Sequence, residues 1–211
     1  MIKNESIIQG KQFILDECYR ANVDKSNPID LTETEFECFL KHLGAAHVFT
    51  VRSQLGCDGD CDMFEGYTIQ THSNFSVPKS LTTGNFVWQN VLLKAIKHTP
   101  RRSQCCQLPQ YVVSQRFERD IPWILPIDVT PSKCPTQEIA RLPRQLEVLD
   151  RRFDLVGVTV WSRGHFTASV LIKNQWFHYD GMASPTLQEG QSKEGHLRTI
   201  IYMPSLAPRI A

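Results

Sequence analysis

The sequence predicts an α+β fold in which helices come first along the chain and strands follow. Helix-spaced apolar residues occur mainly in the first half of the chain, and a run of strand-like segments occupies the last third. The chain has 211 residues, of which 41% are hydrophobic and 21% charged. These values suit a globular domain with a buried core, and they exclude collagen, a long coiled coil and wholesale disorder.

The charge balance and the apolar runs limit the classes of partner. With 23 basic and 22 acidic residues the net charge is +1, so no global field favours nucleic acid or an anionic membrane. No apolar run approaches the roughly 18 residues that a membrane span needs. The polar segment Met1–Gly10 lacks the apolar core of a secretory signal. We therefore expect an intracellular protein, in the cytoplasm, the nucleus or both, with neither nucleic acid nor a membrane as partner.

Three helices are predicted from apolar spacing and capping residues. The first covers about 7–18, where apolar side chains fall on one helical face. The second begins at the capping box formed by Thr32 and Glu35 and ends at Gly44. The third runs from about Asn85 to His98. Its predicted inward residues are Val87, Val91, Leu92, Ala95 and Ile96.

The remaining periodic segments favour strands. They are Val48–Val51, Tyr67–Thr71, Tyr111–Val113, Ile121–Val129, Leu155–Trp161, Phe166–Ile172, Trp176–Tyr179 and Leu197–Met203. Pro126 interrupts the fourth, because proline cannot donate to a strand ladder. The polar residues around Lys173–Gln175 predict an antiparallel hairpin between the two segments that flank them.

His165 and Asp180 stand at the start and the end of this predicted hairpin. A Cys/His/Asp hydrolase needs an imidazole base beside its nucleophile and a carboxylate that orients the imidazole. Neighbouring strands hold such a pair steadily, but a slip of one residue in register would place the two side chains on opposite faces. The spacing alone favours two ordinary polar residues at strand ends.

Longer motifs around these two residues resemble a known family. Gly164–Ala168 followed by Gln175–Asp180 resembles the histidine box of the ubiquitin-specific proteases, in which a Gly-His-aromatic strand precedes a Trp-aromatic strand that ends in Asp. Further segments are similar to other parts of that family: Thr34–Leu40, Ile121–Ile127, Leu142–Val148, Phe153–Val158 and Thr199–Met203. The resemblance extends in order from about Thr32 to Met203 and is most specific in the last sixty residues or so.

The resemblance implies a papain-like ubiquitin-specific protease fold, here truncated. It divides the single domain 1–211 into a helical thumb-like part at 1–45, a fingers-like insertion at 46–120 and a β palm with the histidine box at 121–211. It also implies thiol-dependent hydrolysis of ubiquitin or ubiquitin-like conjugates, with ubiquitin or a ubiquitin-like protein as partner.

The resemblance assigns roles to particular residues. His165 corresponds to the general base and Asp180 to the acid that orients it, whereas Gly181 stands where the family has a second acid. Strand alternation places His178 on the same face as Asp180, where we expect a structural role. The residues expected to contact substrate are Gly164, Phe166, Trp176 and Tyr179.

The nucleophile is the main departure from the family. No segment matches its cysteine box, and Cys18 shares with it only the Cys-Tyr pair. Asp16 and Glu17 beside Cys18 would raise the pKa of its thiol, which disfavours a thiolate. We therefore expect a fragment or pseudoenzyme that begins after the cysteine box or has lost it. An active protease using Cys18 and a non-catalytic interaction module, with ubiquitin or another protein as partner, remain the alternatives.

The seven cysteines raise the question of a metal. Cys57 and Cys61, followed by Cys105 and Cys106, stand where many ubiquitin-specific proteases hold a structural zinc. The first spacing suits zinc, but adjacent cysteines do not easily occupy two tetrahedral positions. The alternative is a degenerate finger with free thiols, and no cofactor is required for the implied chemistry.

Overall fold

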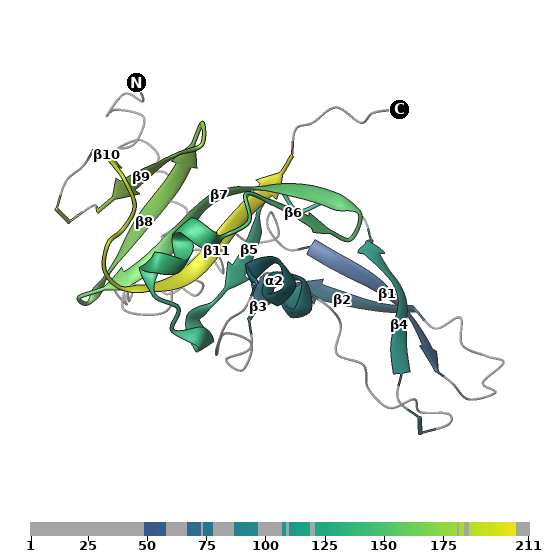
Figure 1. Ribbon diagram of the computed structural model, residues 1–211. Helices are drawn as coiled ribbons and strands as arrows, with labels where there is room; N and C mark the ends of the chain where they lie inside the picture. Colours follow the sequence, from purple (N-terminus) through teal and green to yellow (C-terminus); the bar gives the residue numbers. More distant parts are fainter. Residues whose placement is uncertain are drawn as a thin grey trace, which may run out of the picture.

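The computed structural model describes two β-sheets joined around one apolar core (Figure 1). The residues that it describes are 49–57, 67–72, 74–77, 87–96, 107–108, 110–118, 121–180, 182–183 and 186–205. In Figure 1 the smaller sheet extends away from the larger one at the end opposite to β8, β9 and β10.

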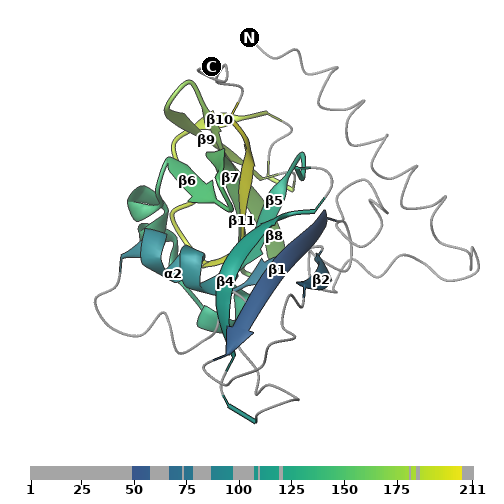
Figure 2. The ribbon, with the colours of Figure 1, turned by 90° about the vertical axis from the view of Figure 1, so that its right-hand side faces the viewer.

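The smaller sheet has three antiparallel strands in the order β2-β1-β4. Its strands are β1 (Phe49–Cys57), β2 (Tyr67–His72) and β4 (Gln110–Phe117). On β1, Phe49, Val51 and Leu55 are buried and alternate with half-exposed residues, as expected for a strand with one face on a core. Figure 2 shows β1 and β4 running side by side.

The larger sheet has the order β10-β9-β8-β7-β11-β5-β3, with β6 paired to β7 beside this path. Only the contact between β3 and β5 is parallel. The bounds are β3 Phe75–Ser76, β5 Leu125–Asp128, β6 Gln145–Val148, β7 Arg151–Ser162, β8 His165–Ile172, β9 Gln175–Tyr179, β10 Gln188–Glu189 and β11 His196–Pro204.

Two tight turns fix the register of β7, β8 and β9. Arg163 and Gly164 join β7 to β8 with φ values of 50° and 88°, and Lys173 and Asn174 join β8 to β9 with φ values of 49° and 66°. Two-residue turns with positive φ at both positions match the right-handed twist of the strands that they connect. The predicted hairpin is thus confirmed, with Gln175 as the first residue of β9.

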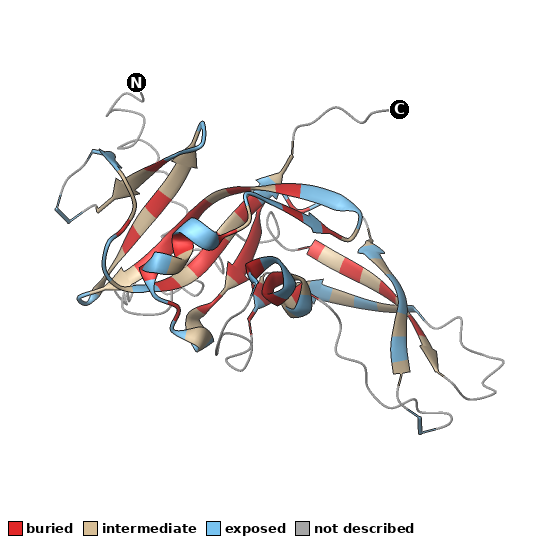
Figure 3. Ribbon diagram, in the orientation of Figure 1, coloured by how far each residue is buried: buried red, intermediate tan, exposed pale blue. Residues whose placement is uncertain are grey.

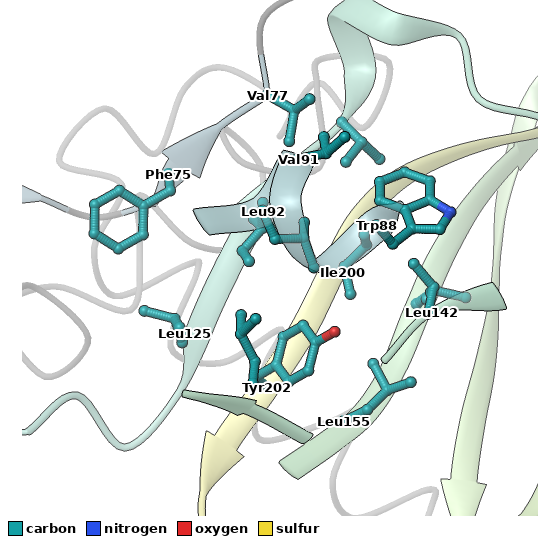
Figure 4. Packing of buried hydrophobic residues seen from close by; sticks show 14 of the residues in the cluster. Phe75, Val77, Trp88, Val91, Leu92, Leu125, Leu142, Leu155, Ile200 and Tyr202 are labelled. Carbon is teal, nitrogen blue, oxygen red and sulfur yellow. The ribbon is translucent and has the colours of Figure 1, made fainter. Parts of the chain in front are cut away.

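One helix packs on the large sheet, where it contacts β3 and β6. In α2 (Trp88–Ile96), Trp88, Val91, Leu92 and Ile96 are buried at helical spacing. Figure 4 shows Trp88, Val91 and Leu92 of this helix gathered with residues of the sheet. The indole Nε1 of Trp88 donates a hydrogen bond of 2.9 Å to Glu138 Oε2. Glu138 belongs to η5 (Thr136–Arg141), which with η4 (Thr130–Ser132) is one of the two short 3-10 helices among the described residues.

The core lies between α2 and the large sheet, where buried residues are concentrated in Figure 3. Tyr202 of β11 is fully buried, and its hydroxyl donates a hydrogen bond of 3.0 Å to the carbonyl of Pro143. Burial raises the pKa of this tyrosine. The other sheet residues at the centre of the core are Leu125, Ile127, Leu155, Val158, Val160, Leu197 and Ile200.

Several predictions about the elements are confirmed and two are wrong. The strand segments appear near their predicted places, but β5 begins only at Leu125 and contains Pro126. Proline is tolerated there because β3 pairs only with Ile127 and Asp128, so the ladder on that side ends before Pro126. Val87, predicted to face inward, is 63% exposed because it precedes α2, and Trp88 is the buried residue instead.

The described part of the chain is mostly β-sheet, with one α-helix. The first two predicted helices lie outside the described residues. The strand half of the α+β prediction is therefore confirmed, and the helical thumb-like part stays a prediction. No helix in the described part has the length and apolar character to cross a membrane.

Candidate functional site

One face of the large sheet changes from apolar to polar across a single row of paired residues. Directly opposed residues lie on the same face, and the row runs Ile127, Ile200, Val158, Ser169 and His178. The first three belong to the core under α2, whereas Ser169 and His178 lie on β8 and β9 beyond it. The candidate site is thus a polar continuation of the core face.

His165 and Asp180 meet at the outer end of this face. His165 is the first residue of β8, and Asp180 follows directly after β9. Because Ala168 pairs with Tyr179, the two residues share a face and lie diagonally across the two strands. His165 Nε2 is 3.1 Å from Asp180 Oδ2.

The carboxylate of Asp180 is held from both sides. Its Oδ1 accepts hydrogen bonds from the backbone N–H groups of Met182 at 3.0 Å and Ala183 at 3.2 Å, which leaves Oδ2 to His165. The hydrogen bond from His165, aided by those two amides, lowers the pKa of Asp180. An ionised Asp180 assigns the proton of this bond to Nε2, so Nδ1 of the neutral ring is the basic nitrogen.

A cavity of about 420 Å³ opens beside this pair. Its lining residues all have polar side chains, and they come from the end of β7 and the β7–β8 turn, from β8, β9 and β10, and from the segment after β10. The lining residues include Ser162, His165, Thr167, His178, Asp180 and Ser192. A concave site that contains a base–carboxylate pair is the natural place to look for chemistry.

A hydroxyl cluster in the wall of the cavity was not predicted. Ser192 Oγ lies 2.9 Å from His178 Nδ1 and 3.1 Å from Thr167 Oγ1, and it accepts a hydrogen bond of 3.2 Å from Ser169 Oγ. The alternation of His165, Thr167 and Ser169 at a period of two carried a signal, because three polar residues then share one strand face. Nothing in the sequence around Ser192 indicated its position.

The residues predicted to contact substrate do not gather in one place. Gly164 is exposed next to His165, and a Cβ built there would meet nothing within 4 Å. Phe166 points to the other face of β8, where its ring packs edge-on against Trp161 at 4.6 Å between centroids. Trp176 is buried in the core, and Tyr179 alternates with His178 and Asp180 along the strand. Of the four, Gly164 is the one exposed next to the base.

No cysteine of the described part lines this cavity. Cys134 is buried after η4, and that burial raises the pKa of its thiol, which disfavours a reactive thiolate. Cys57 ends β1 in the smaller sheet. Cys18, the weak candidate for the nucleophile, lies outside the described residues.

Only one of the four predicted zinc ligands lies in the described residues. Cys57 is described, but Cys61, Cys105 and Cys106 are outside the described residues. Within the described ranges, no three His, Cys, Asp or Glu side chains come together as a metal-binding group. The structural zinc stays a prediction.

A family model described as dopamine receptor-interacting protein 1, DRIP1, matches residues 11–191. The chain belongs to the DRIP1 family. No curated protein sequence was found to match it. The sequence resemblance pointed to the ubiquitin-specific proteases, and the family model that matches is a different one.

Solved structures similar to the DRIP1-family chain come from the SAGA DUB module, which contains Ubp8, Sgf11, Sus1 and Sgf73. The module bound to monoubiquitin aligns with a TM-score of 0.53 at 14% identity, over 95% of this chain and 48% of the other. The module bound to ubiquitin aldehyde aligns with a TM-score of 0.51 at 13% identity, over 95% and 49%. The module with a Ubp8 variant and Sgf11(1-72, Delta-ZnF) aligns with a TM-score of 0.52 at 14% identity, over 94% of this chain and 48% of the other.

These alignments show similarity of fold alone, because the identities are low. The DRIP1-family chain spans about half the length of the solved chains that it matches. The mostly β architecture therefore resembles that of a deubiquitinase module.

Proposed function

We propose that this chain is a ubiquitin-specific-protease-like domain that binds ubiquitin or a ubiquitin-like protein beside His165 and Asp180. The 3.1 Å contact between these two side chains is the observation that carries the proposal, because it stands on a fold similar to a DUB module. One of the similar structures is described as bound to monoubiquitin. The nearby exposed Gly164 leaves space for the backbone of a bound chain to approach the imidazole.

The chemistry that such a site serves is acyl transfer to a thiol. Nδ1 of His165 would accept the proton of a cysteine thiol, and the thiolate would attack the carbonyl carbon of the scissile bond. The imidazolium would then protonate the leaving amine, and water would hydrolyse the thioester with His165 again as base. Asp180 would hold the ring and stabilise its charged form.

We propose that the chain is a pseudoenzyme rather than a complete hydrolase. Among the described residues the base has no cysteine beside it, and the thiol of Cys134 is buried. A thiol attack requires a nucleophile within hydrogen-bond reach of the base. A cysteine from outside the described residues would have to supply it.

A ubiquitin probe with a C-terminal electrophile tests both parts of the proposal. Intact-mass analysis is expected to find no adduct, while unmodified ubiquitin or a ubiquitin-like protein binds in a micromolar titration. An adduct on one cysteine that is lost in His165→Ala would establish an active protease instead. The matched control is His196→Ala, since His196 is exposed and does not line the cavity. No binding to any modifier would refute the proposal.

A second candidate is a non-catalytic module for another protein. The family to which the chain belongs is named for interaction with dopamine receptors, which favours binding over catalysis. Capture of a stable partner that competes with neither ubiquitin nor a ubiquitin-like protein would support this candidate over the first.

A further inference from the structure

A short segment between two glycines forms part of the cavity wall. This segment, Gly190–Gly195, is called the strap here. Gly190 and Gly195 have φ values of 116° and 114°, in a region that other residues rarely adopt. Four strap residues line the cavity wall: Gln191, Ser192, Lys193 and Glu194.

Ser192 is the buried point of the strap. Ser192 is 6% exposed, whereas Lys193 and Glu194 on the same segment are exposed. The Ser192 backbone N–H donates a hydrogen bond of 2.9 Å to Ser169 Oγ, and Ser169 Oγ donates one of 3.2 Å back to Ser192 Oγ. Strand β8 and the strap thus hold each other through one reciprocal pair.

Two further groups complete the surroundings of Ser192. His178 Nδ1 on β9 is 2.9 Å from Ser192 Oγ, and Thr167 Oγ1 on β8 is 3.1 Å away. A hydroxyl has one proton to donate and two lone pairs that accept. With three side-chain neighbours, Ser192 Oγ has no hydrogen-bonding capacity left over. These three contacts make Ser192 the anchor of the strap.

The remaining strap contacts lie outside this anchor. Thr136 Oγ1 of η5 donates a hydrogen bond of 3.0 Å to the Lys193 carbonyl, which holds the second half of the strap. The Gly190 N–H donates to the Trp176 carbonyl at 2.8 Å. The ion pair between Arg163 and Glu194 is exposed on both sides, so water competes with it.

We propose that the strap is a lid on the cavity beside His165, latched shut by Ser192 and pivoting at its two glycines. Loss of the latch frees the cavity wall while Thr136 keeps the far half of the strap attached. The lid then controls access to His165 and Asp180. This inference stands on the cavity geometry and does not depend on ubiquitin binding or on hydrolysis.

Hydrogen exchange on the full chain tests the latch. Ser192→Ala removes the hydroxyl bonds, and amides of residues 191–194 are expected to exchange roughly ten-fold faster. Exchange in β7 and β8 should stay as in the wild type. Ser162→Ala is the matched control, because Ser162 lines the same cavity but lies outside the strap. Unchanged strap exchange, or an equal increase throughout β8 and β9, would overturn the proposal.

A second variant releases the strap without touching Ser192. A Cβ at Gly190 would meet nothing within 4 Å, so Gly190→Ala acts through its positive φ alone. It should raise strap exchange in the same residues. In both variants diethyl pyrocarbonate should modify His165 faster than in the wild type and in Ser162→Ala. Equal modification rates in all four proteins would show that the strap is not a lid.

Discussion

The imidazole of His165 and the carboxylate of Asp180 meet diagonally across β8 and β9, at 3.1 Å between Nε2 and Oδ2. The positions of both residues are set by the strand register, because two-residue turns at both ends of β8 fix that register. The pair lies on the same face as the apolar core, at the edge where that face becomes polar. In this arrangement Nε2 of His165 contacts Asp180, and Nδ1 is the nitrogen that can act as a base.

Acid should weaken the fold through Asp180. The pKa of Asp180 is lowered in the folded state from its usual 3.8, so its contribution to stability is present above that value. This contribution is lost as the pH falls through the folded pKa. In Asp180→Asn, unfolding by urea should therefore depend less on pH between neutrality and pH 3 than in the wild type. Asp154→Asn, on β7 away from the cavity, is the control. If unfolding of Asp180→Asn depended on pH as strongly as unfolding of the wild type, the stabilising contact between His165 and Asp180 would be contradicted.

Helix α2 should be essential to the core. Leu92 is fully buried, so Leu92→Ala leaves a cavity and is expected to lower the free energy of unfolding by about 2–5 kcal/mol. Val87 is one residue before the helix and 63% exposed, so Val87→Ala should change the free energy of unfolding by less than about 0.5 kcal/mol. Chemical denaturation of both variants makes the comparison. Similar losses in the two would show that α2 is not packed on the sheet.

Two glycines with positive φ should respond differently to alanine. Gly164→Ala meets open space, so only backbone strain of roughly 1 kcal/mol is expected. At Gly195 the added Cβ would lie 2.4 Å from the Trp161 carbonyl oxygen, which adds a further ~1–3 kcal/mol. Thermal unfolding should therefore rank Gly195→Ala as the less stable variant. The reverse order would mean that the strap does not pack against β7.

The thiol of Cys134 should be unreactive in the folded protein. It is 3% exposed, and burial raises its pKa, so little thiolate forms at neutral pH. Iodoacetamide at neutral pH should leave Cys134 unmodified in native protein and modify it in denaturant, as read by peptide mass. Rapid modification of the native protein would refute the assigned burial.

The sequence predicted the longer strands because their alternation is local, whereas the short strands β3, β6 and β10 were not predicted. The turn at Lys173–Asn174 and the paired segments around it follow from polar residues between two apolar runs. Pro126 was misleading, because proline disrupts a strand only where its missing N–H would be needed, and the end of β3 decides that. Val87 was assigned to the helix interior although the helix begins one residue later.

The candidate site was predicted in part. His165 and Asp180 could be paired from the strand pattern together with the family resemblance, but their common face depended on the register, which the turns decide. Ser192 could not be predicted from the sequence, because its contact with His178 is made by the segment that follows β10 and leads to β11. Such a contact depends on tertiary structure, and no local pattern in the chain encodes it.

The most direct test of the proposed function is to titrate the isotope-labelled chain with ubiquitin and with ubiquitin-like proteins while observing the imidazole resonances of His165. The account predicts that one of these modifiers shifts the His165 signals in a saturable manner at micromolar concentration. The signals of His196, which does not line the cavity, should stay in place. Absence of any shift at His165 with every modifier would contradict the account.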